Sequence, residues 1–378
     1  MAEEQPEQAL ELRSLVTETG TVELTLVEVD VPVPSTDDVL VRVEAAPINP
    51  SDLGLLLAGA DVGEARASGT AERPVVTAPL DAGAARAATA RIGQSMAVGN
   101  EGAGRVVAAG LGDAAQALLG RTVAIAGGGM YTQYRCVPAT ACLPLPDGVS
   151  AAEGAAAFVN PMTALAMVET MRAEGHTGLV HTAAASNLGQ MLNRICLEDG
   201  VPLVNVVRSP AQADLLRAAG AAFVCDSSSG TFMDELTAAL RATSATLAFD
   251  AVGGGTLASR ILTAMEAALT AGAEFSRYGS TVHKQVYLYG SLDRGPTELR
   301  RSYGMAWGVG GWLLTPFLIA AGSERVEAMR QRVAAGLTTT FASHFSERVT
   351  LAGALDLDAL ADYSHMGTGR KFLVTPNG

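Results

Sequence analysis

The chain has 378 residues, of which 48% are hydrophobic and 17% are charged, and its formal net charge is −13. This length and composition predict a globular protein with room for two domains, and they exclude a predominantly disordered chain. An acidic protein lacks the positive surface that attracts phosphate backbones or anionic lipids, so we expect neither a nucleic-acid nor a membrane partner.

Two segments, the N-terminus and residues 304–322, bear on whether the chain is secreted or inserted into a membrane. Met1 to Pro6 is acidic and lacks an apolar core, so we expect no secretory signal and a cytoplasmic location. Residues 304–322 are uncharged over nearly membrane-spanning length but contain Pro316 and several glycines. We interpret this stretch as a buried strand followed by a core helix rather than as a membrane span.

The first part of the chain shows the period of β-strands. Apolar and polar residues alternate from about residue 10 to 45 and again from 103 to 143, which predicts a β-rich, partly closed barrel. Between these parts, Ala58 to Met96 is rich in Ala, Gly and Arg and lacks a clear period. We interpret it as a mobile insertion, with a lid over the site as the alternative.

After Phe158, helical and strand patterns alternate at the length of βα units, which predicts a doubly wound parallel sheet. A helix begins at Asn160-Pro-Met-Thr-Ala, with Pro in its first turn. The elements predicted next are strand 178–182, a helix ending at Gly200, strand 203–207, helix 211–219, strand 222–225, helix 232–241, strand 246–250, a helix after Gly253–Gly255, strand 286–289 and a last strand near 312–314.

The tail from Lys371 to Val374 regains strand character and is expected to pair back into the first domain. The predicted division is therefore a β-rich domain at 1–158, a dinucleotide-binding domain at 159–315 and a return to the first domain at 316–378. The fold class is α/β.

The segment from His181 to Gly189 joins a predicted strand to a predicted helix, as in the dinucleotide-binding half-fold. Pyrophosphate binding needs backbone N–H groups at a helix N-terminus and little side-chain bulk. We expect Asn187 to adopt the left-handed conformation where Gly is usual, and Gly189 to permit close packing of helix on strand. The residues predicted to bind the cofactor here are Ala184, Ser186, Asn187, Leu188 and Gly189.

Arg208 ends the predicted strand 203–207, about where NAD-binding domains place an Asp or Glu on the ribose 2′-hydroxyl. A carboxylate would repel a 2′-phosphate, whereas a guanidinium can hold it with two parallel hydrogen bonds. The sequence therefore predicts NADPH as the cofactor.

Five further motifs stand out along the chain: Ala46-Pro-Ile-Asn-Pro-Ser-Asp52, Gly99-Asn-Glu-Gly-Ala-Gly104, Leu145-Pro-Asp-Gly-Val-Ser150, Asn160-Pro-Met-Thr-Ala164 and Asn205-Val-Val-Arg208. Their order and spacing are those of the medium-chain dehydrogenase/reductase superfamily, and the chain resembles its zinc-independent branch, the NADPH:quinone oxidoreductases and 2-enoyl thioester reductases. The resemblance covers nearly the whole chain. It implies a GroES-like catalytic domain, a Rossmann domain and a homodimer built by edge strands of the Rossmann sheets.

The resemblance also implies roles for individual residues. Asn49 and Thr163 would face the nicotinamide. Asn49 and Asn100 stand where the metal-dependent relatives have Cys and His, and neutral amides are poor zinc ligands, so no metal is expected. At the ends of two predicted strands, the residues expected on the nicotinamide side of the cofactor are Asp250, Val252, Gly253, Tyr289, Gly290 and Ser291.

The similar enoyl thioester reductases carry a Tyr acid downstream of the position of Asp52, but here no tyrosine precedes Tyr131. We therefore expect hydride transfer to a quinone or related conjugated carbonyl, whose reduced anion needs no strong protein acid. One alternative is an enoyl thioester reductase with a substitute donor, Tyr131 or a water. Another is a non-catalytic NADPH-binding sensor. For Tyr131, core packing is an equally good interpretation.

Overall fold

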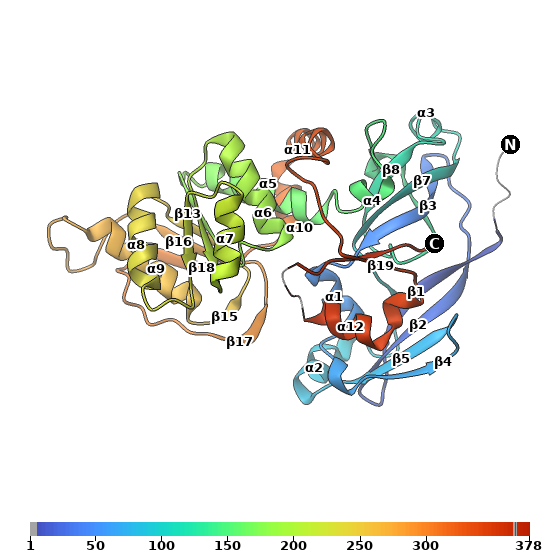
Figure 1. Ribbon diagram of the computed structural model, residues 1–378. Coiled ribbons are helices and arrows are strands. Elements are labelled where there is room, and N and C mark those ends of the chain that lie inside the picture. Colours follow the sequence, from blue (N-terminus) through green and yellow to red (C-terminus); the bar gives the residue numbers. More distant parts are fainter. Residues whose placement is uncertain (1–5, 366, 368) are drawn as a thin grey trace. The chain divides into compact units, whose positions relative to one another are not determined.

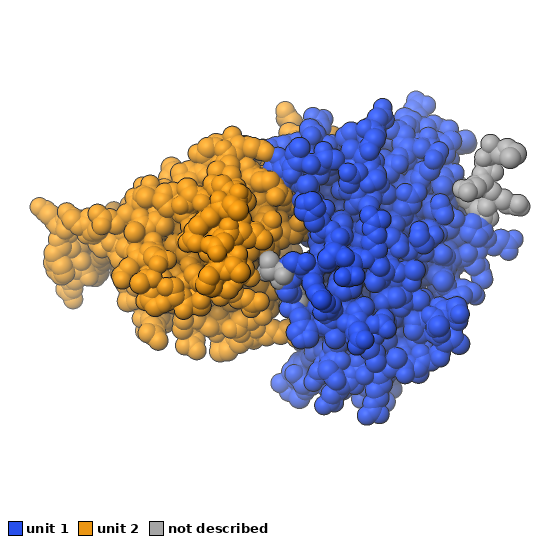
Figure 2. All heavy atoms as spheres, in the orientation of Figure 1, with its two compact units in different colours: residues 1–159, 330–378 blue, residues 160–329 orange. Residues whose placement is uncertain are grey.

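The computed structural model describes residues 6–365, 367 and 369–378. It divides into two compact units: unit 1 is Met1–Val159 with Arg330–Gly378, and unit 2 is Asn160–Met329 (Figure 2). The first boundary differs by one residue from the predicted one, but the return to unit 1 falls at Arg330 and not at residue 316. Residues 1–5, which carried the prediction about a secretory signal, lie outside the described residues.

Unit 1 is built on two β-sheets (Figure 1), ordered β4-β5-β2-β1-β6 and β10-β8-β7-β3-β20-β19, with β9 also paired to β3. Its strands are β1 (Gln8–Val16), β2 (Thr21–Asp30), β3 (Asp38–Pro47), β4 (Arg66–Gly69), β5 (Pro74–Pro79), β6 (Ser95–Ala97), β7 (Glu101–Ala109), β8 (Thr122–Ala126), β9 (Tyr134–Pro138), β10 (Leu143–Pro144), β19 (Glu347–Val349) and β20 (Phe372–Val374). Its helices are α1 (Pro50–Leu57), α2 (Ala82–Ala87), α3 (Asp113–Gln116), α4 (Ala151–Gly154) and α12 (Leu357–Ser364), with short 3-10 turns η1 (Val62–Glu64), η2 (Thr89–Arg91), η3 (Ala139–Ala141) and η4 (Gly353–Leu355).

The apolar residues that alternate with polar ones in the sequence form the core of unit 1. Val22 and Leu24 on β2 and Val39, Val41 and Val43 on β3 are all buried in one cluster. Burying each such side chain stabilises the fold by about 1.5–3 kcal/mol relative to leaving it exposed. The tail also pairs as predicted, because β20 lies antiparallel to β3.

The interpretation of Ala58 to Met96 as a mobile insertion is wrong. The segment holds β4, β5, α2 and β6, and β5 pairs with both β2 and β4. The sequence hid this because β5 is a short strand flanked by Gly- and Ala-rich turns, which dilute any period. Val76 and Ala78 on β5 nevertheless enter the core.

Unit 2 contains a parallel sheet ordered β13-β12-β11-β14-β16-β18. Its strands are β11 (Leu179–His181), β12 (Leu203–Val207), β13 (Phe223–Asp226), β14 (Leu247–Asp250), β15 (Gly253–Gly255), β16 (Lys284–Leu288), β17 (Asp293–Thr297) and β18 (Trp307–Gly311). Its helices are α5 (Val159–Ala173), α6 (Asn187–Asp199), α7 (Pro210–Ala218), α8 (Phe232–Thr243), α9 (Leu257–Thr270), α10 (Leu314–Ala321) and α11 (Ser323–Ala335); α5 begins one residue before the unit boundary and α11 crosses it.

Two predictions about residues 304–322 are wrong. The last strand of the sheet is β18 and not a strand near 312–314, because the glycine-rich run Trp307–Gly311 pairs with β16 despite its low intrinsic strand preference. The helix that follows, α10, is no core helix: none of its residues is buried, and Ile319 is 79% exposed.

One helical segment of the described residues, Ala151–Ala173, is long and apolar enough to cross a membrane by length and composition alone. Its most apolar window is 72% buried within the protein, as in the core helices of globular proteins.

The folded state of residues 58–96 can be checked by hydrogen exchange. We expect the β5 amides of Val76 and Ala78 to be protected like those of β2, because both strands belong to one sheet. Amide exchange followed by NMR or mass spectrometry measures this. Exchange of the β5 amides at the rate of an unfolded peptide would contradict the assignment.

Candidate functional site

The predicted cofactor residues lie at one edge of the parallel sheet in unit 2. The chain runs from β11 outward through β12 to β13, then returns to the other side of β11 with β14, β16 and β18. Ligands of such sheets bind beyond the carboxyl ends of the strands, where the strand order reverses. Here that point lies between β11 and β14. The turn 182–189, Arg208, Asp250–Gly253 and Tyr289–Ser291 follow the ends of β11, β12, β14 and β16.

The turn after β11 leads directly into α6, whose first residues pack closely against the end of the strand. Ser186 caps α6 and accepts a hydrogen bond from the Gly189 backbone N–H at 3.1 Å. A Cβ added at Gly189 would lie 2.2 Å from the Ala184 carbonyl oxygen, so only glycine allows this approach of helix to strand end. The positive end of the α6 dipole suits a phosphate.

The left-handed residue of this turn was predicted wrongly. Asn187 is the first residue of α6, and Ala183 instead has φ +51°. Such a conformation costs a non-glycine residue roughly 1–2 kcal/mol. The neighbouring Ala184 is buried and its N–H donates to the Val206 carbonyl at 3.2 Å, which holds the turn on the sheet.

Arg208 directly follows β12 and is exposed. Its backbone N–H donates to Gln212 Oε1 at 3.1 Å, while within the described part of the chain its guanidinium forms no ion pair. Asp226, the residue opposite Val207 on β13, accepts hydrogen bonds from the backbone N–H and hydroxyl of Ser228. The guanidinium is therefore available to an anion.

The side chain of Asp250 is turned into the protein. It accepts hydrogen bonds from Thr182 Oγ1 at 2.7 Å and from the Val252 N–H at 2.9 Å, and the Ala251 N–H donates to Thr182 Oγ1 at 2.8 Å. Asp250 is fully buried, so this network ties the end of β14 to the end of β11. Asp250 thus shapes the crevice through its backbone and supplies no free carboxylate.

A histidine that we did not select joins the site. His181, on β11 and fully buried, shares a hydrogen bond of 2.7 Å between its Nε2 and the Tyr289 hydroxyl, and the two rings stack with centroids 5.7 Å apart. Burial lowers the pKa of His181 to about 3 and raises the pKa of Tyr289, so both are neutral. Lone histidines in strands carry no sequence signal, which is why only the fold identifies this pair.

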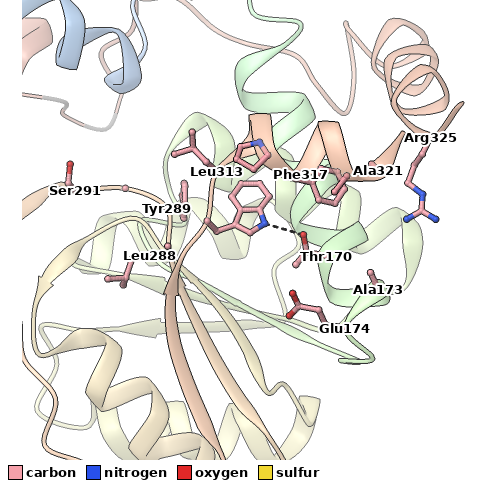
Figure 3. A pocket seen from close by; sticks show the side chains of 15 residues that line it. Thr170, Ala173, Glu174, Leu288, Tyr289, Ser291, Leu313, Phe317, Ala321 and Arg325 are labelled. Atoms are coloured by element: carbon pink, nitrogen blue, oxygen red, sulfur yellow. Dashed lines mark hydrogen bonds between the residues drawn. The ribbon is translucent and has the colours of Figure 1, made fainter. Parts of the chain in front are cut away.

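A pocket of about 660 Å³ lies in unit 2 beside Tyr289, between α5, the ends of β16 and β18, and α10 (Figure 3). Trp312 forms part of its wall, and its indole N–H donates to Thr170 Oγ1 at 3.2 Å. The pocket is lined by Thr170, Ala173, Glu174, Leu288, Tyr289, Gly290, Ser291, Gly311, Trp312, Leu313, Pro316, Phe317, Ala320, Ala321 and Arg325. Thr163, at the start of the same α5, is 7% exposed.

Unit 1 contains a buried polar cluster around Asn49. Asn49 caps α1, is 2% exposed, and donates from Nδ2 to Glu101 Oε1 at 2.8 Å. Glu101 is fully buried and its other oxygen accepts from the N–H groups of Phe158 and Val159, both at 2.8 Å. The Asn49 side chain therefore faces the Glu101 carboxylate with its NH₂ group, which donates hydrogen bonds and does not bind metal ions. Residues 6–365, 367 and 369–378 contain no group of three or more His, Cys, Asp or Glu suited to a metal ion.

Asp52 and Tyr131 belong to the same cluster. Asp52 accepts from the N–H groups of Asn49 and Asn100, both at 2.7 Å, and burial raises its pKa from 3.8 to about 7. Tyr131 is 1% exposed, and its hydroxyl donates to the Pro47 carbonyl at 3.1 Å and interacts with Asp52. Burial raises the pKa of Tyr131 well above 10, which makes it a poor proton donor and favours the core-packing interpretation.

Lys371, which the sequence indicated only as the start of the C-terminal strand, supplies the positive charge of this cluster. Its Nζ is buried without a hydrogen-bond partner and lies 5.0 Å from the centre of the Phe345 ring. Burial lowers the pKa of Lys371 to about 8, opposed by the charges of Glu101 and Asp52. Because the lysine comes from the far end of the sequence, no local pattern could have placed it here.

Comparison with known proteins finds a domain family that matches part of unit 1 and solved structures similar to nearly the whole chain. Residues 35–147 match the alcohol dehydrogenase GroES-like domain. A structure of a protein assigned as an NADPH:quinone reductase from Mesorhizobium loti is 26% identical, with 99% of this chain and 100% of that chain covered and a TM-score of 0.73. No curated protein matches the chain.

Two further structures are similar in fold. One is a protein assigned as an NADPH:quinone reductase from Bacillus thuringiensis, 17% identical, with 97% of this chain and 99% of that chain covered and a TM-score of 0.73. The other is Etr1p in complex with NADP and crotonyl-CoA, also 17% identical, with the same coverage and a TM-score of 0.66.

The shifted carboxyl of Asp52 predicts a measurable pH dependence of stability. Between pH 3.8 and about 7 the folded chain holds a proton that the unfolded chain releases, so this group favours folding at acidic pH and that contribution is lost as the pH rises to about 7. We expect the unfolding free energy of the wild-type protein, minus that of Asp52→Asn, to fall over this range and level off above it. Urea unfolding at a series of pH values measures the difference; a pH-independent difference would contradict the shift.

Proposed function

We propose that the chain is a member of the zinc-independent branch of the medium-chain dehydrogenase/reductase superfamily, and that it is an NADPH-dependent oxidoreductase that transfers hydride to a quinone or related conjugated carbonyl. The observation that carries the proposal is the crevice in unit 2. There the N-terminus of α6 meets the end of β11 at Gly189, and the guanidinium of Arg208 stands free at the end of β12.

The residues of the crevice fit a phosphorylated dinucleotide. The N-terminus of α6, with the Leu188 N–H and the helix dipole, would hold the pyrophosphate, and Arg208 would hold the 2′-phosphate. Thr163 and the segment Tyr289–Ser291 would line the nicotinamide side. NADPH, when bound, supplies the hydride.

The residues of unit 1 favour an acceptor that needs little help from an acid. Asn49 is held by Glu101 and would orient the acceptor carbonyl, while the hydroxyl of Tyr131 is already engaged by Pro47. A quinone accepts hydride without a strong protein donor, because the hydroquinone anion is itself stabilised. The names of the relatives from Mesorhizobium loti and Bacillus thuringiensis support the same substrate class.

An enoyl thioester reductase is the second candidate, because Etr1p, which shares the fold, binds NADP and crotonyl-CoA. Without Tyr131 as donor, this reaction would draw its proton from water. A non-catalytic NADPH sensor is the remaining alternative. We further propose that the protein is cytoplasmic, binds neither nucleic acid nor membrane, and forms a homodimer through edge strands of the unit 2 sheets.

Substrate class can be tested by following NADPH absorbance with 1,4-benzoquinone or crotonyl-CoA as the acceptor. We expect rapid oxidation with the quinone and little with the thioester. Faster oxidation with crotonyl-CoA would favour the enoyl reductase, and tight NADPH binding with no turnover of either acceptor would favour the sensor.

The role of Arg208 can be tested by charge reversal. We expect Arg208→Glu to weaken NADPH binding by roughly 100-fold or more, because a bidentate charge-assisted contact becomes a repulsion. NADH binding should change far less. The control is Arg217→Glu, because Arg217 is also an exposed arginine of unit 2, lies on α7 and forms an ion pair with Asp214. Calorimetric titration measures both cofactors, and equal weakening of NADPH and NADH would show that Arg208 does not meet the 2′-phosphate.

A further inference from the structure

His181 and Tyr289 form a pair of side chains that reaches across the end of β14. In the sheet of unit 2, β14 lies between β11, which ends at His181, and β16, which ends one residue before Tyr289. Nε2 of His181 and the Tyr289 hydroxyl oxygen are 2.7 Å apart, and the rings stack with an angle of 24° between their planes. The pair therefore stands at the carboxyl edge of the sheet, beside the point where the strand order reverses.

The pair lies on the face of the sheet that α5 covers. His181 is in register with Phe249, and Phe249 is in register with Tyr287, so these three side chains share one face. The Tyr287 hydroxyl donates to Glu174, the residue directly after α5, at 2.7 Å. Since Tyr289 follows Tyr287 by two residues, its side chain returns to the same face. His181 and Tyr289 thus meet on the α5 side of the crevice.

Tyr289 is held through both its main chain and its side chain. Its backbone N–H donates to the Asp250 carbonyl at 3.0 Å, and its hydroxyl shares the hydrogen bond with His181. His181 is fully buried, whereas Tyr289 is half-buried and lines the pocket of unit 2 (Figure 3). The hydroxyl end of Tyr289 is thus fixed inside the protein while part of its ring faces the pocket. Such a side chain has lost its rotational freedom before any ligand binds.

A histidine at position 181 is not what packing alone would favour. Its Nδ1 is buried and has no hydrogen-bond partner among the described residues. A buried polar atom without a partner costs stability, and an apolar side chain would avoid that cost. Burial also lowers the pKa of His181 to about 3, so the ring carries no charge at neutral pH. What His181 contributes beyond an apolar residue is therefore its hydrogen bond to Tyr289.

We propose that His181 is a positioning residue for hydride transfer, because by holding the Tyr289 hydroxyl it fixes the Tyr289 ring as a wall behind the nicotinamide. The inference rests on the proposed NADPH-dependent function and adds the residue that sets this wall. Thr163, the other residue expected at the nicotinamide, belongs to α5 and so lies on the same side of the sheet. Hydride transfer depends steeply on the distance between donor and acceptor, and a misplacement of about 1 Å can slow a reaction roughly 100-fold.

Paired substitutions test whether His181 acts through Tyr289. Tyr289→Phe keeps the ring and removes the hydroxyl, and His181→Phe keeps a buried ring and removes its nitrogens. We expect each change to slow the single-turnover oxidation of NADPH at saturating 1,4-benzoquinone by roughly 10-fold, with the NADPH dissociation constant nearly unchanged. The double variant should be no slower than either single variant, and His181→Gln, whose amide can reach the hydroxyl, should restore most of the rate. Losses that multiply in the double variant would overturn the inference.

Two hydrogen bonds of the same length elsewhere in unit 2 provide matched controls. Tyr287→Phe removes the bond from β16 to Glu174, and His176→Phe removes a bond of 2.7 Å between Nδ1 and Thr246 Oγ1. We expect both controls to leave the single-turnover rate unchanged. Deuterium at the transferred position of C4 should slow the reaction of the wild type and of Tyr289→Phe, which identifies the measured step as hydride transfer. A loss in Tyr287→Phe equal to that in Tyr289→Phe would overturn the inference.

The fluorescence lifetime of bound NADPH gives a readout that does not depend on turnover, because a reduced nicotinamide fluoresces longer when its motion is restricted. We expect Tyr289→Phe and His181→Phe to shorten this lifetime and Tyr287→Phe to leave it unchanged. Equal lifetimes in the wild type and Tyr289→Phe overturn the inference. A wild-type protein that binds NADPH but reduces neither benzoquinone nor crotonyl-CoA contradicts the proposed function, and the lifetimes then still decide whether His181 fixes the wall.

Discussion

The close approach of α6 to the end of β11 is the constraint on which the site in unit 2 depends. At Gly189 the helix lies so near the Ala184 carbonyl that a single added carbon would overlap it. This contact aims the helix N-terminus across the carboxyl edge of the sheet, toward the point where the strand order reverses. Arg208 and the Tyr289 segment follow β12 and β16 at the same edge of the sheet, so the sheet topology brings them to the side on which α6 begins.

Unit 1 contains a buried cluster of charged and polar groups around Glu101. Glu101 is satisfied by two backbone N–H groups and the amide of Asn49, and Lys371 balances its charge from the C-terminal strand. Such a network is costly to break, because any member left alone would be an uncompensated buried polar group. It fixes Asn49 in one orientation, which is consistent with the role proposed for this residue, the positioning of the acceptor carbonyl.

Periodicity and turn chemistry were enough to predict most of the fold. Alternation placed β2 and β3 in the core, and the strand β12 was predicted at its observed bounds. The failures have physical causes. Three of the five residues of β18 are glycines, which rarely form strands, and α10 is apolar yet exposed, so neither element followed the usual relation between sequence and structure. His181 and Lys371 join their sites only through long-range packing, which no local pattern records.

The central claim is that the guanidinium at the end of β12 selects the phosphorylated cofactor. Calorimetric titration of the wild-type protein with NADPH and with NADH, at the same ionic strength, tests this claim most directly. The account predicts clearly tighter binding of NADPH, with the preference weakening as salt screens the contact. Equal affinity for the two cofactors, or binding of neither, would contradict it.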